Sequence, residues 1–119
     1  MSEEAARPVL ALVRDLMFMS RITAAARGSG IDVQVVRDPE GLAGRAGGLL
    51  LVDLNLAGAV GAAAAWKQAQ GGRVVGFVSH VDTDTIAQAR QAGLDQVLAR
   101  GAFVQLLPGI LSEARDSLK

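Results

Sequence analysis

The feature that most constrains the fold of this chain is a fivefold alternation of short apolar runs with longer, alanine-rich segments. The apolar runs are rich in β-branched residues and predict strands. Because they are continuously apolar and do not alternate with polar residues, they indicate a parallel sheet that is covered on both faces. The predicted strands span Val9–Val13, Val33–Val36, Leu49–Asp53, Val74–Val78 and Gln96–Ala99.

The intervening segments have the apolar spacing of helices. Asp38, before Pro39, and Asp82 or Thr83, before the fourth segment, are predicted N-caps, because a side-chain oxygen there accepts hydrogen bonds from free backbone amides. Strands and helices then form an α/β, doubly wound sheet with right-handed crossovers. The five predicted helices span Met17–Arg27, Glu40–Arg45, Ala57–Gln70, Thr83–Ala92 and Phe103–Ser117.

Length and composition narrow the class of protein. A chain of 119 residues has room for one core, so we predict a disordered segment at residues 1–7 and a single domain at residues 8–119. The formal net charge is zero, which disfavours nucleic-acid binding. The absence of cysteine excludes disulfides and thiolate metal sites. Neither a secretory signal nor a membrane span is recognisable, and we expect a cytoplasmic protein.

Polar residues follow four of the predicted strands. In doubly wound sheets the loops at the carboxyl ends of the strands form the binding site, so these residues are expected to converge at one edge. They are Arg14 and Asp15 after the first strand, Asp53 and Asn55 around the end of the third, Ser79 and His80 after the fourth, and Arg100 after the fifth.

The sequence resembles the receiver domain of bacterial response regulators, the CheY-like family. The resemblance is carried by Asp53-Leu54-Asn55, by Ser79 and by the stretch VRDLMFMSRI at Val13–Ile22. It implies a flavodoxin-like fold with strand order 2-1-3-4-5 and five helices. It also implies that Asp53 accepts a phosphoryl group, that Ser79 is the switch hydroxyl, and that Asp15, Asp53 and Asn55 are the Mg²⁺ ligands.

The sequence also departs from the family pattern. Arg14 replaces the first of two adjacent metal-binding acids, Arg100 replaces a lysine, Gly101 replaces a proline, and Val97 replaces an aromatic residue. A guanidinium removes a ligand and repels the cation, so we expect weak or absent Mg²⁺ binding and no other cofactor. Our hypothesis is that Arg14 and Arg100 neutralise Asp15 and Asp53 without metal.

These departures favour an atypical, stand-alone receiver that acts in signal transduction by binding a protein, without Mg²⁺-dependent phosphorylation and without being an enzyme. The alternative is a response regulator that is phosphorylated on Asp53 and has residual autophosphorylation and dephosphorylation activity; Asp53 as a purely structural acid also stays open. The expected partner is a kinase or an effector. A homodimer through the fourth helix, fifth strand and fifth helix is a further expectation, with a surface comprising Ile86, Gln88, Arg90, Gln91, Leu98 and Val104.

The segment after Asp15 is unusually apolar. Phe18, Met19 and Ile22 have the spacing of a buried helix face, which is the favoured reading, whereas a protein-contact patch that includes Met17 and Phe18 is the alternative. Met17 is the residue that helix burial explains least. Trp66 is expected to pack against the sheet edge, and His80 is expected to be an idle loop residue and not a group that tunes phosphotransfer.

Overall fold

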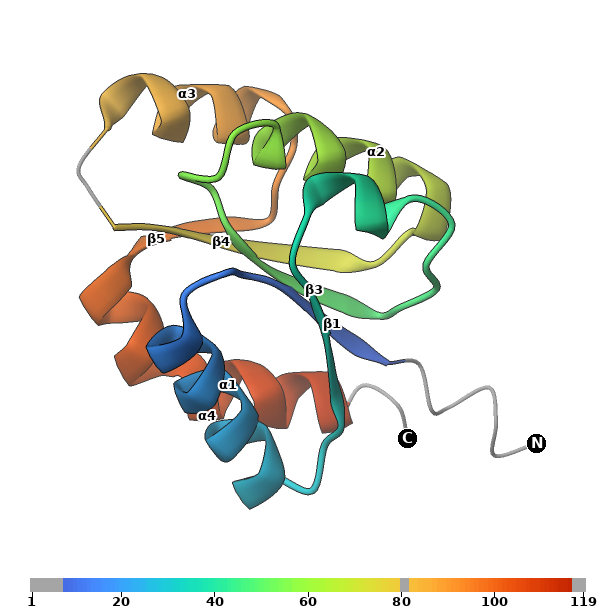
Figure 1. The fold of residues 1–119 in the computed structure, drawn as a ribbon, viewed down its shortest axis with the longest axis vertical. Coiled ribbons are helices and arrows are strands. Elements are labelled where there is room, and N and C mark those ends of the chain that lie inside the picture. Colours follow the sequence, from blue (N-terminus) through green and yellow to red (C-terminus); the bar gives the residue numbers. More distant parts are fainter. Residues whose placement is uncertain (1–7, 80–81, 117–119) are drawn as a thin grey trace.

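The computed structural model describes residues 8–79 and 82–116, which form one layered α/β unit (Figure 1). All strand pairs are parallel, and the strand order β2-β1-β3-β4-β5 is the predicted one. The elements are β1 (Val9–Leu12), α1 (Leu16–Gly28), β2 (Val33–Val36), the 3₁₀ helix η2 (Pro39–Leu42), β3 (Leu49–Asp53), α2 (Ala59–Gln70), β4 (Arg73–Val78), α3 (Thr83–Gln91), β5 (Gln96–Ala99) and α4 (Arg100–Asp116).

The sheet separates two layers of helices. In Figure 1, α1 and α4 lie on one face, while η2, α2 and α3 lie on the other. A hydrophobic core lies on each face of the sheet, and β1 contributes residues to both. Val9 and Ala11 belong to the core under α1 and α4, whereas Leu10 and Leu12 belong to the core on the opposite face. This two-sided burial explains why the central strands are continuously apolar.

The prediction of the second helix is wrong. The segment Glu40–Arg45 does not form an α-helix, and a single 3₁₀ turn, η2, stands there, so the described residues contain four α-helices where five were expected. Glycine disfavours a helix interior, and Gly44 has a φ of +76°, which ends the turn. A Cβ on Gly41 would lie 2.8 Å from Val36 Cγ1, so the turn packs closely onto the end of β2.

The helix caps and helix starts agree only in part with those predicted. Of the two candidate caps of α3, Asp82 is the one that caps it, because its Oδ1 accepts from the amides of Asp84 and Thr85. Asp38 does not cap η2 through its side chain. The last helix begins at Arg100, directly after β5, and not at Phe103. Arg100 is therefore the first residue of a helix and not part of a loop.

The prediction that Trp66 packs against the sheet is confirmed. Its side chain is buried, and its indole Nε1 donates to the carbonyl of Arg45 at 2.8 Å. The ring packs beside Gly72, where an added Cβ would lie 2.4 Å from the indole. Trp66 thus joins α2 to the segment that leads into β3.

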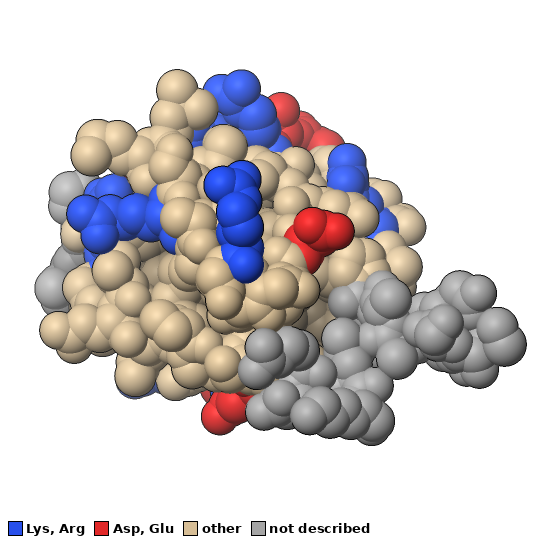
Figure 2. All heavy atoms as spheres, turned by 90° about the horizontal axis from the view of Figure 1, so that it is seen from below, with Lys and Arg blue, Asp and Glu red and all other residues tan. Residues whose placement is uncertain are grey.

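The outer surface of the α1 and α4 layer is shown in Figure 2. Basic side chains on this face stand apart from one another, with acidic side chains near some of them, and form no continuous positive patch. Within the described residues, no helix is long and apolar enough to span a bilayer.

Candidate functional site

Asp53 stands at the carboxyl end of β3, where its carboxylate Oδ1 accepts from the backbone amide of Asn55 at 3.0 Å. Burial raises the pKa of Asp53, because a charged carboxylate loses hydration there. The Asn55 hydrogen bond and the positive charge of Arg100 oppose the shift, while the charge of Asp15 adds to it. The acid predicted as phospho-acceptor is thus a half-buried carboxyl at the edge of the sheet.

Asn55 links two neighbouring loops. Its side-chain Oδ1 accepts from the backbone amide of Ser79 at 2.6 Å, so the loop after β3 is tied to the end of β4. The structure thereby brings Asp53, Asn55 and Ser79 together, as the sequence predicted. Ser79 is exposed. His80 lies outside the described residues.

Asp15 has both carboxylate oxygens engaged. Oδ1 caps α1 by accepting from the amides of Met17, at 2.9 Å, and Phe18, at 3.2 Å. Oδ2 accepts from Arg100 Nη2 at 3.2 Å. The pKa of Asp15 is lowered, first by the Phe18 amide and then by the Met17 amide and Arg100, while desolvation of the carboxylate opposes the shift. Asp15 therefore remains an anion that is already coordinated by protein donors.

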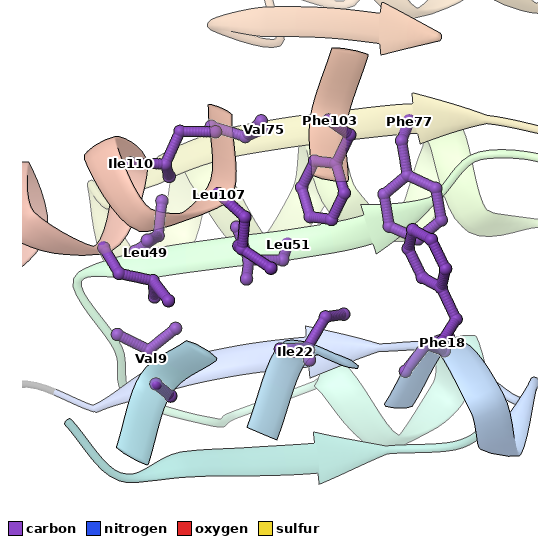
Figure 3. Packing of buried hydrophobic residues seen from close by; sticks show 14 residues of the cluster. Val9, Phe18, Ile22, Leu49, Leu51, Val75, Phe77, Phe103, Leu107 and Ile110 are labelled. Atoms are coloured by element: carbon purple, nitrogen blue, oxygen red, sulfur yellow. The ribbon is translucent and has the colours of Figure 1, made fainter. Parts of the chain in front are cut away.

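The Arg100 side chain lies against an aromatic cluster formed by Phe18, Phe77 and Phe103. Its guanidinium carbon lies 4.6 Å from the centroid of the Phe18 ring, a cation–π arrangement. The Phe18 ring in turn lies 4.5 Å from Phe77 and 5.6 Å from Phe103, between centroids. Figure 3 shows these three rings meeting from α1, β4 and α4. The core on this face thus positions the cation that holds Asp15.

The expectation that both arginines neutralise Asp15 and Asp53 is half wrong. Arg14 turns away: its Nη2 donates to Asp38 Oδ1, and its Nε donates to the carbonyl of Arg37 at 2.9 Å. The reason is the parallel pairing of β1 with β2, in which the amide of Val13 binds the carbonyl of Val36 at 3.0 Å. The residues that follow these strands are therefore neighbours.

Asp38 and Phe18 are site residues that the sequence analysis missed in these roles. Asp38 was assigned to a cap, although its position directly beyond β2 could have paired it with Arg14, directly beyond β1. Phe18 was expected to be a core residue or, in the alternative, part of a protein-contact patch. Its position under Arg100 depends on packing between α1 and α4, which periodicity does not report.

The donor set fits Mg²⁺ poorly. A magnesium site needs near-octahedral oxygen ligands, including free carboxylates. Both oxygens of Asp15 already accept protein hydrogen bonds, and Arg100 places a cation against its Oδ2. Position 14 supplies no carboxylate ligand, since Arg14 stands there and pairs with Asp38. In the described segments, no group of three or more His, Asp or Glu side chains is placed to hold a metal ion.

Comparison with known proteins finds neither a matching family model nor a matching curated protein. Solved structures do match. A CheY-like response-regulator receiver domain protein from Methanospirillum hungatei JF-1 gives a TM-score of 0.79 at 13% identity, over 94% of this chain and 95% of that one. The phosphorylated cyanobacterial phytochrome response regulator RcpA gives 0.73 at 19% identity, over 92% and 91%. The receiver domain of Francisella response regulator 1452 gives 0.76 at 17% identity, over 95% and 99%.

Proposed function

We propose that this chain, which has the fold of response-regulator receiver domains, is a signalling module that acts by binding another protein without Mg²⁺-dependent phosphorylation. The observation that carries the proposal is the engagement of Asp15. Two backbone amides and Arg100 occupy both of its carboxylate oxygens. The only other acid within the predicted metal-binding set is Asp53.

Arg100 supplies the positive charge that a metal would otherwise bring. Its guanidinium is held from both sides, by the Asp15 carboxylate and by the Phe18 ring. Such a cation offsets repulsion between Asp15 and Asp53 permanently, since an arginine does not dissociate or lose its proton. The site would then keep one charge state, and the partner-binding surface one conformation.

A second candidate function is phosphorylation on Asp53. It is supported by the half-buried carboxyl at the end of β3 and by the Asn55–Ser79 hydrogen bond, which holds Ser79 beside the loop of the acceptor. In this function the partner would be a phosphoryl donor, and Arg100 would have to neutralise phosphoryl oxygens in addition to Asp15.

An amide NMR titration with Mg²⁺, followed by beryllofluoride, separates the two functions. The wild-type chain is expected to show no saturable shifts at millimolar Mg²⁺, and Asp53→Ala is the control. Saturable shifts at Asp53, Ser79 and Arg100 that vanish in the control would refute the metal-independent function and support the second one.

Two variants that are expected to gain Mg²⁺ binding complement this titration. Arg14→Asp supplies the missing acid, and Arg100→Lys replaces the forked guanidinium with a single ammonium, which holds Asp15 less rigidly. We expect the Arg14→Asp single variant to gain measurable Mg²⁺ binding by calorimetry and the double variant to bind more tightly. Absence of binding in both would show that features other than these two arginines exclude the metal.

A further inference from the structure

The beginning of α1 projects two apolar side chains into solvent. Leu16 is 66% exposed and Met17 is 73% exposed. Phe18 and Ile22 already form the buried face of α1, so helix packing does not explain either residue. Arg21 lies one turn after Met17, is exposed, and has no side-chain partner within residues 8–79 and 82–116. Leu16, Met17 and Arg21 are named the α1 tip.

An apolar hollow of about 310 Å³ lies between η2 and α2. It is present because η2 is one short turn and leaves the alanine-rich side of α2 uncovered. Glu40 lies on its rim, is exposed, and has no side-chain partner in the described part of the chain. The hollow is lined mainly by Pro39, Leu42, Ala62, Ala65, Trp66 and Ala69.

The hollow extends toward the α1 tip. A second depression shares Pro39, Glu40 and Ala62 with it and is lined by Arg14 at its other end. Arg14 precedes Leu16 by two residues. The α1 tip and the hollow therefore flank one corner of the molecule, which the Arg14–Asp38 ion pair occupies.

We propose that two copies of this chain associate about a twofold axis at this corner, with Leu16 and Met17 of each copy entering the hollow of the other. The chain carries both halves of a complementary contact: an apolar projection beside an exposed cation, Arg21, and an apolar hollow beside an exposed anion, Glu40. A twofold dimer uses such a contact twice. Methionine adapts its flexible side chain to irregular apolar surfaces, which suits Met17 to this place.

Sedimentation velocity of the full chain over a concentration series tests the proposal. The wild-type chain is expected to dimerise reversibly. Because Met17→Glu removes an apolar contact at two places in the dimer, we expect its dissociation constant to rise at least about 100-fold. Leu106→Glu is the matched control, since Leu106 is 47% exposed on α4 and lines neither depression. It should leave the dissociation constant unchanged.

A charge exchange identifies the polar contact. Arg21→Glu and Glu40→Arg should each weaken the dimer, and the double variant should recover most of the wild-type affinity. A wild-type chain that stays monomeric at every concentration overturns the proposal. So does a dimer that survives Met17→Glu but is lost in Leu98→Glu, which would assign association to the surface of α3, β5 and α4. Because the Mg²⁺ titration reports on Asp53 and not on mass, these results are independent of the proposed function.

Discussion

Phe18→Leu tests whether the aromatic cluster of Phe18, Phe77 and Phe103 stabilises the site around Arg100 and Asp15. The buried Phe18 ring has two aromatic neighbours and carries the Arg100 guanidinium. Leucine keeps an apolar side chain at this position but removes all three ring interactions. Aromatic pairs contribute about 1 kcal/mol each beyond buried area. A half-exposed cation–π contact adds about 0.5 kcal/mol.

The expected loss in free energy of unfolding is therefore about 2–3 kcal/mol, which corresponds to a fall in Tm of roughly 8–12 °C for a domain of this size. Urea denaturation followed by the fluorescence of Trp66 measures it, because Trp66 is the only tryptophan and is buried. Ile22→Val is the control: Ile22 is as buried on the same helix, and the change should cost about 1 kcal/mol. If Phe18→Leu costs no more than the control, the ring interactions do not stabilise the site.

Three further predictions concern single positions. Since burial raises the pKa of Asp53, its charged form costs stability above that raised pKa. Asp53→Asn should therefore raise Tm at pH 7, with a gain that vanishes below pH 3.8, the ordinary value; equal gains at both pH values would contradict this. Gly76→Ala places a Cβ 2.5 Å from Leu54 Cδ1 and should cost about 1–3 kcal/mol in urea denaturation. Trp66→Phe loses the hydrogen bond to Arg45 and should cost about 1 kcal/mol by thermal unfolding monitored by circular dichroism.

The local sequence pattern predicted most of the fold. Each strand was recognisable as a short β-branched run, and burial of neighbouring β1 residues on opposite faces is the physical reason for that pattern. The prediction failed at Glu40–Arg45. There the apolar spacing suggested a helix, but two glycines within the segment, Gly41 and Gly44, favour a tight turn, and a side chain at Gly41 would collide with Val36.

The sequence by itself determined that the chain forms a parallel sheet and that Asp53, Asn55 and Ser79 meet at its carboxyl edge, because strand ends in a parallel sheet lie together whatever the loops do. Only the tertiary structure decided which charges pair. Arg100 reaches Asp15 across 85 positions of sequence, and Arg14 reaches Asp38 across 24. These choices follow from the direct start of α4 after β5 and from the register of β1 on β2, which are long-range contacts that no local periodicity encodes.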